Sequence, residues 1–461
     1  MRFTELAARR IAVWGFGREG RAALTALRAR LPDQPVTVFC TAAEAERVAA
    51  TAPPEVGVVA RGSPPDAEAL AAFDVVVKSP GISMYRPEIA AAAARGTVFT
   101  SGTALWFGEN PQARAIAVTG TKGKSTTSAM IAHVGRVLGM RTALAGNIGM
   151  PLLDLLGQHA ALWVIELSSF QAGDAGPVDV GVVTNLHEEH LDWHGSRERY
   201  VADKLRLVDA ARTLVIGADQ DEVRRRTQTH PRRIEFGGRD GWHIDGSGAI
   251  ARGHSVVDPA FGASLRVPGH HNRMNACAAL AALDARLAFD VQTAAEAARS
   301  LASFRGLPHR LQFVGERDGT RYIDDSISTT PAATLAGLSS VGGNGRTAVI
   351  VGGHERGVDW SGFARAVRER RDIEVIAQGA NGPRIAAALR AASVGCAVRE
   401  LEDLAAATAL AIRAHADVVL LSPGAPSFDQ FVDYAERGRA FAALAGFDDT
   451  GDDGIPGLGI A

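Results

Sequence analysis

Residues 117–126 read AVTGTKGKST and constrain the fold more than any other segment of the chain. An apolar run ends before Gly120, and a helical pattern begins at Lys124. A glycine-rich turn between a strand and a helix exposes backbone amides that can wrap phosphate oxygens. Lys124 would add a point charge for the β- and γ-phosphates, and Ser125 a hydroxyl for Mg²⁺. The strict phosphate-loop pattern is broken by Val118 at its first glycine, yet a plain tight turn would not need Gly-Lys-Ser-Thr. The loop therefore predicts a nucleoside triphosphate site.

Strand-like and helix-like segments alternate along the whole chain. The segments GENPQ and RGLPHR have the composition of linkers. This pattern predicts an α/β protein of three domains: a Rossmann-like first domain, a central P-loop ATPase-like domain and a Rossmann-like last domain. The expected bounds are residues 1–108, 109–305 and 306–461. The Gly- and Asp-rich tail from residue 448 onward is expected to be loosely held.

Two further motifs, IELSSFQ and HEEHLDWH, follow predicted strands. Ligands bind at the carboxyl ends of strands in open α/β sheets, so Glu166 and His190 are expected near the phosphate loop, where they could complete a Mg²⁺ site. Oxygen ligands suit Mg²⁺, and a lone histidine is a less typical addition. The alternative is a hydrogen-bonded loop histidine. A zinc-protease site is excluded because the HExxH spacing is missing.

Only four of the 49 basic residues are lysines, and the other 45 are arginines. Arginine evidently serves wherever a generic surface cation is needed. The remaining lysines are therefore candidates for sites that a guanidinium cannot fill. Lys122 and Lys124 lie in the phosphate loop, and Lys204 lies on a predicted helix, where a solvated lysine is the usual alternative. Lys78 has no assigned mechanism.

The first glycine-rich turn, GFGREG at residues 15–20, has the spacing of a dinucleotide-binding unit. Such a unit places an acidic residue at the end of its second strand to hold the ribose, but here that strand ends in Phe39 and Cys40. A dehydrogenase is therefore poorly supported, and the turn suits the diphosphate of another nucleotide, such as a UDP-sugar. SPGIS at residues 79–83 supplies a second Gly/Ser turn in the same block. Either turn could instead be purely structural.

Charge and cysteine content exclude several classes of protein. A formal net charge of −2 leaves no basic surplus for a generic nucleic-acid binder. The three cysteines are far apart, which argues against a disulfide framework or a zinc ribbon. No apolar segment approaches the ~18 residues of a membrane span, and no signal-peptide pattern opens the chain. We expect a cytoplasmic monomer without a nucleic-acid or membrane partner.

Six motifs occur in the order found in the Mur ligases of peptidoglycan synthesis: GTKGKST, IELSSFQ, HEEHLDWH, GHHNRMNA, GLPHR and LLSPGAPSFD. The chain resembles that family over essentially its whole length. Within the family it is similar to the MurD type, which adds glutamate to UDP-N-acetylmuramoyl-L-alanine. The segments GFGREG and KSPGIS are similar to the uridine-nucleotide domain of that type. The resemblance implies an ATP-dependent ligase that works through an acyl phosphate.

The resemblance also implies roles for individual residues. The ATP site would comprise Gly120, Thr121, Lys122, Gly123, Lys124, Ser125, Thr126, Asn272, Asn275, Arg310 and Asp325, with the two asparagines on the adenine side. The UDP-substrate site would comprise Gly15, Phe16, Gly17, Arg18, Ser79, Pro80, Gly81 and Asn147. The incoming glutamate would contact Thr329, Arg356, Ser427 and Tyr434. Two Mg²⁺ ions would be held by Ser125, Glu166, His190 and a carbamate on Lys204, and the catalytic residues would be Lys124, Glu166, His190 and Lys204.

Two positions depart from the usual glutamate-adding pattern. DSIST places Ile327 where a lysine is common near the incoming amino acid, and GGHERG places Arg356 where another lysine is common. Loss of a cation beside a dicarboxylate should weaken or reposition it. The phosphate loop also has Lys122 where asparagine is common. The combination of TGTKGKST, DSISTTP and GGHERG resembles a branch of the family that uses L-glutamate, in which a separate epimerase later inverts the glutamyl centre. The alternative is the same ligase with D-glutamate.

Other interpretations stay open at this stage. A ligase that adds other amino acids, such as a folate polyglutamate or cyanophycin synthetase, disagrees with the uridine-type first domain. A phosphate-loop ATPase that drives motion would need a partner-facing switch segment, which nothing in the sequence demands. Phosphate release that depends on both the muramoyl substrate and the amino acid would separate a ligase from such an ATPase.

Overall fold

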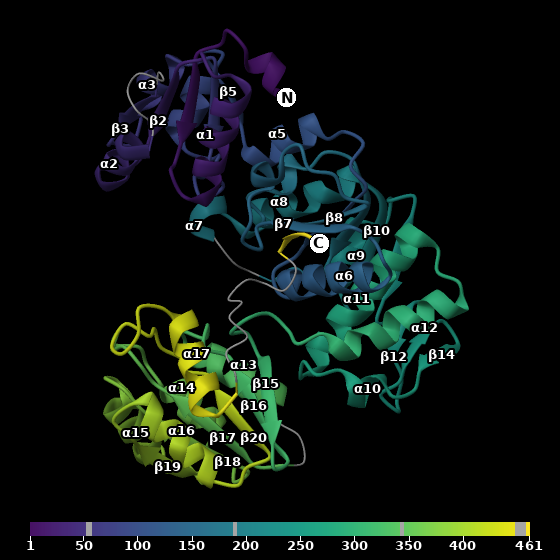
Figure 1. The fold of residues 1–461 in the computed structure, drawn as a ribbon, viewed down its shortest axis with the longest axis vertical. Coiled ribbons are helices and arrows are strands. Elements are labelled where there is room, and N and C mark those ends of the chain that lie inside the picture. Colours follow the sequence, from purple (N-terminus) through teal and green to yellow (C-terminus); the bar gives the residue numbers. More distant parts are fainter. Residues whose placement is uncertain (52–57, 188–190, 342–344, 448–457) are drawn as a thin grey trace. The chain divides into compact units, whose positions relative to one another are not determined.

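Parallel sheets alternate with helices along the chain, which confirms the α/β class expected from the sequence (Figure 1). The computed structural model describes residues 1–51, 58–187, 191–341, 345–447 and 458–461. The chain divides into two compact units. Unit 1 comprises Met1–Pro259, Met274–Arg299 and Gly457–Ala461, and unit 2 comprises Ala260–Arg273 and Ser300–Pro456.

The first sheet of unit 1 has five parallel strands in the order β3-β2-β1-β4-β5. Every residue of β1 and β4 is buried, as their apolar runs require of a sheet covered on both faces. Because β1 pairs with β2 on one side and β4 on the other, a crevice is expected at the carboxyl ends of β1 and β4. The elements are η1 (Phe3–Leu6), β1 (Ile11–Trp14), α1 (Arg18–Arg30), β2 (Val36–Phe39), α2 (Ala42–Thr51), β3 (Val58–Arg61), α3 (Ala67–Ala71), β4 (Val75–Lys78), α4 (Pro87–Ala93), β5 (Val98–Thr100) and α5 (Gly102–Glu109).

The second sheet of unit 1 has seven strands in the order β11-β10-β9-β6-β8-β7-β21, all parallel except β21. Every residue of the central strands β6, β8 and β7 is buried. Its strands are β6 (Ala115–Thr119), β7 (Thr142–Gly146), β8 (Leu162–Glu166), β9 (Val178–Val183), β10 (Ala211–Gly217), β11 (Arg233–Phe236) and β21 (Gly459–Ile460). The helical segments around it are α6 (Lys124–Val137), η3 (Leu152–Leu155), η4 (Ala172–Asp174), α7 (Leu191–His194), α8 (Arg197–Ala210), α9 (Asp221–Arg226), α11 (His270–Leu287) and α12 (Val291–Ser300). A small antiparallel sheet consists of β12 (Trp242–Ile244), β13 (Ile250–Arg252) and β14 (Ser255–Asp258).

The tail of the chain corrects one sequence-based expectation. Strand β21 pairs antiparallel with β7, and the backbone N–H of Thr142 donates to the carbonyl of Ala461. Ile460 is partly buried against the core of unit 1. This part of the tail is therefore held by edge pairing and apolar burial and is not loose. Residues 448–457 lie outside the described residues.

Unit 2 is built on a six-stranded sheet in the order β15-β16-β20-β17-β18-β19, in which only the β15–β16 pair is antiparallel. Helices α13, α14 and α15 pack apolar side chains on one face of the sheet, and α16 and α17 on the other. The strands are β15 (Gln312–Arg317), β16 (Thr320–Asp324), β17 (Thr347–Val351), β18 (Ile373–Ala377), β19 (Ala397–Glu400) and β20 (Val418–Leu421). The helical segments are α10 (Phe261–Ser264), η5 (Leu301–Ser303), α13 (Pro331–Val341), α14 (Ser361–Ala366), α15 (Gly382–Ala391), α16 (Leu404–Arg413) and α17 (Tyr434–Leu444).

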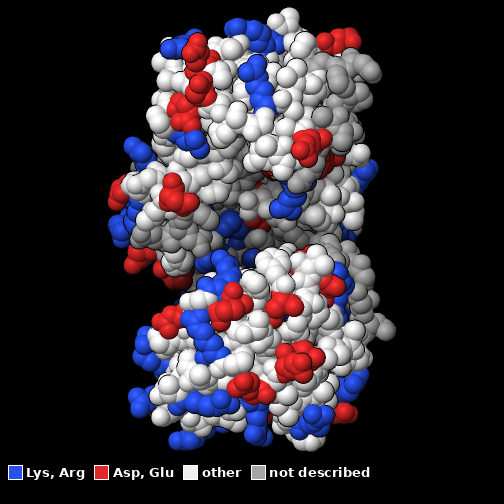
Figure 2. Space-filling model, turned by 90° about the vertical axis from the view of Figure 1, so that its left-hand side faces the viewer, with Lys and Arg blue, Asp and Glu red and all other residues white. Residues whose placement is uncertain are grey.

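The expected domain boundaries stay predictions. The longer segment of unit 2 begins at Ser300, six residues before the expected start of the last domain at residue 306, whereas the first two sheets belong to one unit. Within the described ranges, no helix is long and apolar enough to cross a bilayer. All three cysteines are buried and free of disulfides. Figure 2 shows basic and acidic side chains interspersed on the face in view, as expected for a net charge near zero.

Candidate active site

The phosphate loop follows β6, in the middle of the second sheet. Gly120 and Gly123 have φ values of +139° and +84°, a range that residues with a side chain rarely adopt. A Cβ on Gly120 would clash with Thr184 Oγ1. Thr184 follows β9, and its Oγ1 donates to the Lys122 carbonyl at 2.7 Å. The end of the neighbouring strand thus holds the loop in a conformation that requires glycine.

The side chains of the phosphate loop differ in their surroundings. Lys124 Nζ donates to the Thr121 carbonyl at 2.8 Å, so its ammonium folds back over the loop. Lys122 is exposed, and its backbone N–H donates to Asn185 Oδ1 at 2.9 Å. Ser125 and Thr126 are half-buried in the first turn of α6. Lys124 is therefore the lysine whose charge can neutralise phosphate oxygens bound in the loop.

The two asparagines expected on the adenine side of ATP both lie on α11, and the division between the two units passes between them. Asn275 lies against the phosphate loop, because a Cβ on Gly123 would be 2.5 Å from its Oδ1. That oxygen also accepts from Thr127 Oγ1 at 3.3 Å. Asn272 belongs to unit 2, where its Nδ2 donates to the Pro268 carbonyl at 2.6 Å.

Lys204 is buried, unlike the usual helix lysine. It lies on α8 with 2% of its surface exposed. Its Nζ donates to the Gly120 carbonyl at 2.6 Å and lies 4.9 Å from the centre of the Tyr200 ring. The Tyr200 hydroxyl shares a 2.6 Å hydrogen bond with Thr121 Oγ1. The Lys204 amine therefore contacts the backbone of Gly120, the first glycine of the phosphate loop.

Glu166, the last residue of β8, is 1% exposed and has one carboxylate oxygen without a partner. Asn147 Nδ2 donates to Oε1 at 2.6 Å, whereas Oε2 accepts no hydrogen bond. A buried carboxylate oxygen that lacks a partner is costly, and a hard cation such as Mg²⁺ would satisfy it. Glu166 therefore fits the Mg²⁺ site that the resemblance implies.

His190, the other expected metal ligand of this region, lies outside the described residues. His187, three residues earlier in the sequence, contacts the phosphate loop, because its backbone N–H donates to Thr121 Oγ1 at 2.8 Å. In the part of the chain that the structure describes, no three His, Cys, Asp or Glu side chains gather as a metal site. Among the described residues, the evidence for a Mg²⁺ site therefore rests on the Glu166 carboxylate.

One cavity of about 460 Å³ gathers all eight residues expected to bind the UDP-substrate. It lies at the carboxyl ends of β1 and β4, where the change in strand order predicts a crevice. The loop after β7 completes it, and Arg18 Nη1 donates to the Gly149 carbonyl of that loop at 2.9 Å. The residues expected there are Gly15, Phe16, Gly17, Arg18, Ser79, Pro80, Gly81 and Asn147. Because Asn147 also bonds to Glu166, the cavity adjoins the carboxylate that fits Mg²⁺.

Eight further residues that sequence reasoning missed also line this cavity, among them Glu19, Phe170 and Gln171. Burial raises the pKa of the Glu19 carboxyl to about 7, and the nearby Asp154 contributes in the same direction. Phe170 and Gln171 end the motif IELSSFQ, so their place after β8 was an available signal. Glu19 carried no signal beyond its place inside GFGREG.

Lys78, the lysine without an assigned mechanism, ends β4 and is 4% exposed. Its Nζ donates to the Ser79 carbonyl at 3.4 Å and lies 5.7 Å from the centre of the Trp193 ring. Burial lowers the pKa of its ammonium to about 8, and Asp174 partly opposes that shift. Trp193 Nε1 donates to the Pro80 carbonyl at 3.0 Å. Lys78 and Trp193 therefore both contact the SPGIS turn that lines the cavity.

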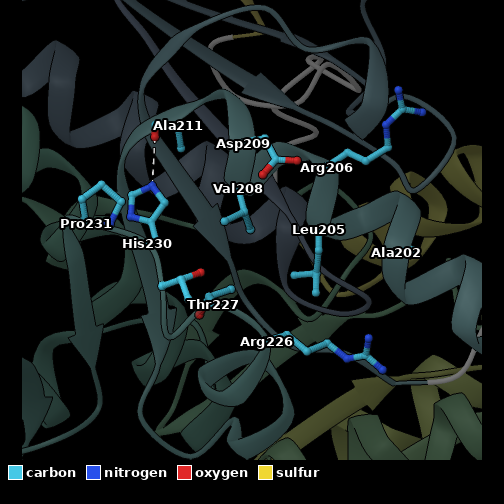
Figure 3. A pocket seen from close by; sticks show the side chains of 11 residues that line it. Ala202, Leu205, Arg206, Val208, Asp209, Ala211, Arg226, Thr227, His230 and Pro231 are labelled. Atoms are coloured by element: carbon cyan, nitrogen blue, oxygen red, sulfur yellow. Dashed lines mark hydrogen bonds between the residues drawn. The ribbon is translucent and has the colours of Figure 1, made fainter.

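A second cavity, of about 500 Å³, lies between α8, α9 and residues 227–231 (Figure 3). The His230 ring bonds through Nε2 to the Ala211 carbonyl at 3.0 Å. The head groups of Arg206 and Arg226 extend away from each other in Figure 3. Binding sites for small molecules bring polar groups together. We therefore assign no ligand to this cavity.

In unit 2 the expected glutamate contacts lie in or after loops that follow three neighbouring parallel strands, β16, β20 and β17. The carboxyl ends of parallel strands share one edge of a sheet, so these loops are neighbours. Ser427 is buried, whereas Thr329 and Arg356 are exposed. Tyr434 begins α17 and is 43% exposed.

Two residues expected at the ATP, Arg310 and Asp325, also belong to unit 2. Arg310 is exposed. Asp325 is buried, and its Oδ2 accepts from Ser328 Oγ at 2.5 Å and from Ser422 Oγ at 2.8 Å. Burial raises the pKa of the Asp325 carboxyl to about 6 although these hydrogen bonds oppose the shift. The expected ATP residues are thus divided between the two units.

Comparison with known proteins agrees with this geometry. Residues 118–283 match the Mur ligase middle domain, and residues 309–424 match the Mur ligase, glutamate ligase domain. A UDP-N-acetylmuramoyl-L-alanine–L-glutamate ligase of Xanthomonas campestris pv. campestris (strain 8004) is 49% identical over the full length of both chains. The chain belongs to the Mur ligase family.

This Mur ligase is also similar to a relative of the same name from Salinispora tropica, with 38% identity over 96% of this chain and 98% of the relative. Among solved structures, the UDP-N-acetylmuramate-alanine ligase MurC from Thermotoga maritima has a TM-score of 0.54 at 23% identity, and the match covers 94% of this chain and 98% of that one. At that identity the likeness shows the fold alone. The family resemblance drawn from the six sequence motifs is confirmed.

Proposed function

We propose that this Mur ligase joins L-glutamate to UDP-N-acetylmuramoyl-L-alanine in peptidoglycan precursor synthesis, with conversion of ATP to ADP and phosphate. The observation that carries the proposal is the match along the chain to relatives at 49% and 38% identity that both bear the name of an L-glutamate-adding ligase. The phosphate loop and the cavity at the first sheet offer sites of matching chemistry.

The reaction begins with activation, because a carboxylate is a poor electrophile at neutral pH. Transfer of the γ-phosphoryl group of ATP to the alanyl carboxylate gives an acyl phosphate and ADP. The glutamate amine then attacks the acyl carbon, a tetrahedral intermediate forms, and phosphate leaves as the amide forms and the amine loses a proton. Phosphoryl transfer depends on positioning and charge neutralisation, to which Lys124 and the amides of the phosphate loop would contribute.

Glu166, Ser125 and His190 would hold Mg²⁺ in this site. When bound, Mg²⁺ supplies positive charge that offsets the charge of the transferring phosphoryl group. Asn147 orients the Glu166 carboxylate through its 2.6 Å hydrogen bond. We expect two ions, the second held with the help of Lys204.

Lys204 would act as a carbamate, formed when its neutral amine captures carbon dioxide. The amine lies at the Gly120 carbonyl, so the carbamate oxygens would lie at the phosphate loop. Arginine stays protonated at all relevant pH values and cannot form a carbamate. This chemistry accounts for a lysine at that position in a chain with only four lysines.

The glutamate would bind at Thr329, Arg356, Ser427 and Tyr434. The preference for the L isomer would follow from Ile327 and Arg356, which change the arrangement of cations around a dicarboxylate, since guanidinium and ammonium groups bind carboxylates differently. An L-glutamyl product would be the substrate of a later glutamyl epimerase. We propose that the ligase acts as a monomer.

Phosphate release measured with L- and D-glutamate in parallel tests the proposal. We expect release only when ATP, the muramoyl substrate and glutamate are all present, with L-glutamate preferred. Preference for D-glutamate would contradict the proposed L isomer of the substrate but not the proposed ligase activity. Release without the muramoyl substrate would indicate a phosphate-loop ATPase of another kind. Lys124→Ala is the inactive control, because it removes the charge expected on the phosphates.

A further inference from the structure

Arg437 is a buried cation to which the proposed reaction assigns no role. It lies on α17 and is 1% exposed. Its Nε donates to Ser326 Oγ at 2.9 Å, and its Nη2 donates to the carbonyls of Ser326 at 2.8 Å and of Ala425 at 3.0 Å. A guanidinium presents its donors in a rigid planar fork. Arg437 uses that fork to join the loop after β16 to the loop after β20.

The hydrogen bonds of Arg437 leave its charge without a carboxylate partner. All three go to neutral oxygens, and Nη1 is buried without a partner. The charges of Asp324 and Asp429 reach the guanidinium, but Asp324 is paired with His309 Nδ1 at 2.7 Å, and Asp429 accepts from the Ala380 N–H at 3.0 Å. Burial lowers the pKa of Arg437 to about 10, so it stays a cation at neutral pH. Burial of a cation among neutral partners is costly, which indicates a role beyond stability.

The unpartnered Nη1 lies against a third loop of the expected glutamate site. A Cβ on Gly353 would be 2.9 Å from Nη1 and would clash with the Pro426 carbonyl. Gly353 has a φ of +155° and belongs to GGHERG, the segment after β17 that also carries Arg356. Ser326 Oγ donates to the carbonyl of Tyr434, the first residue of α17. One guanidinium is thus packed against all three loops and is linked through Ser326 to the start of α17.

We propose that Arg437 positions the glutamate-binding loops and supplies the positive field that draws one carboxylate of the incoming amino acid to them. The inference rests on the proposed function, because it takes glutamate as the second substrate. The three loops carry Thr329, Arg356 and Ser427. Ile327 stands in the first of them where related ligases commonly have a lysine, and the buried guanidinium of Arg437 is a cation packed against that loop. Since Nη1 is covered, Arg437 acts through Ser326 and the loop backbones and is a positioning residue.

Kinetic constants for each substrate test this role. Arg437→Lys keeps the charge without the fork, and Arg437→Gln removes the charge. We expect both variants to raise KM for L-glutamate by at least about tenfold, the factor that corresponds to loss of one hydrogen bond to a charged group, and to reduce the preference for L- over D-glutamate. KM for ATP and for the muramoyl substrate should stay unchanged. Formation of the acyl phosphate without glutamate, trapped with hydroxylamine, should also stay unchanged.

Arg439→Lys is the matched control. Arg439 is a half-buried arginine two residues further along the same helix, so it projects from a different face of that helix. We expect wild-type constants for this variant. Ser326→Ala removes only the Oγ partner of Arg437 Nε and keeps the test available if the arginine variants do not fold. It should raise KM for L-glutamate several-fold.

An unchanged KM for L-glutamate in the folded variants would overturn the inference. Equal losses for all three substrates would also overturn it, because they would indicate a structural role alone. The unmodified protein is assayed first with ATP, the muramoyl substrate and glutamate. Inactivity there would contradict the proposed function itself, so the two failures are distinguishable.

Discussion

Asn147 donates a 2.6 Å hydrogen bond to one carboxylate oxygen of Glu166 and leaves the other oxygen without a partner. The bond joins the loop after β7 to the end of β8, two neighbouring strands of the second sheet. Asn147 also lines the cavity expected to bind the UDP-substrate. A single side chain therefore connects that cavity to the carboxylate that fits Mg²⁺.

Asn147→Ala is expected to raise the Mg²⁺ concentration needed for half-maximal activity by about 10- to 100-fold, because residues that orient a metal ligand have effects of that size. Phosphate release measured against Mg²⁺ concentration checks this. Asn110→Ala is the control, since Asn110 Nδ2 bonds only to the Trp106 carbonyl on its own helix, away from Glu166. An unchanged Mg²⁺ requirement in Asn147→Ala would contradict the orienting role.

Lys204→Ala is expected to lose activity and to regain part of it when a short-chain carboxylic acid is added, because the acid replaces the carbamate oxygens. Lys204→Arg should stay inactive although it keeps a positive charge, since a guanidinium cannot capture carbon dioxide. Phosphate release with and without the added acid measures both effects. Full activity of the alanine variant would rule out the carbamate.

Glu19→Gln is expected to stabilise the protein above pH 7. The pKa of Glu19 rises from 4.5 to about 7 on folding, mainly through burial, so the folded state binds the proton more tightly than the unfolded state. The stability that Glu19 contributes is therefore fully present below pH 4.5 and is lost as the pH rises through 7. The neutral amide should raise the free energy of unfolding at pH 8 by up to about 3 kcal/mol and leave it nearly unchanged at pH 4.

Denaturant unfolding of both proteins at pH 4 and pH 8 measures that difference. An equal effect of Glu19→Gln at the two values would show that the carboxyl group does not titrate in this range. The same variant should bind the UDP-substrate more tightly at pH 8, because it removes a negative charge from a cavity expected to hold a diphosphate.

Gly120→Ala is expected to abolish ATP-dependent turnover and to lower the free energy of unfolding by about 1–3 kcal/mol, the cost of a side chain in such a backbone conformation. The new Cβ would clash with Thr184 Oγ1 at a φ of +139°. Gly246→Ala is the control, because a Cβ there meets nothing within 4 Å. Thermal unfolding and phosphate release test both variants. Wild-type turnover in Gly120→Ala would contradict the tight packing of the loop.

Much of the candidate site could be predicted because its motifs are short and local. The phosphate loop needs only glycines, a lysine and a hydroxyl within ten residues, and the structure gives Gly120 and Gly123 the left-handed conformations that such a turn requires. The eight cavity residues were named through the family resemblance; seven of them lie in GFGREG and SPGIS, which follow the paired strands β1 and β4, and Asn147 follows β7. Lys204 stood out first through the scarcity of lysine, and the family resemblance then implied its role.

Other features carried no local signal. Arg437 is one of 45 arginines, and its partner Ser326 is 111 positions away in the sequence. The pairing of β21 with β7 was equally hidden, because a Gly- and Asp-rich tail predicts a loose segment. The partnerless oxygen of Glu166 could not be inferred from IELSSFQ, since it depends on what the neighbouring strands leave around that carboxylate.

The sequence by itself determined the α/β class, the phosphate loop, the two glycine turns of the first sheet and the family, because each depends on residues that are neighbours in the chain. Only the tertiary structure decided that Lys204 ends at Gly120, that Asn147 bonds to Glu166 and that Arg437 is buried among three loops. The physical reason is that burial and hydrogen bonding between distant residues depend on strand order and packing. A local pattern of side chains does not specify either.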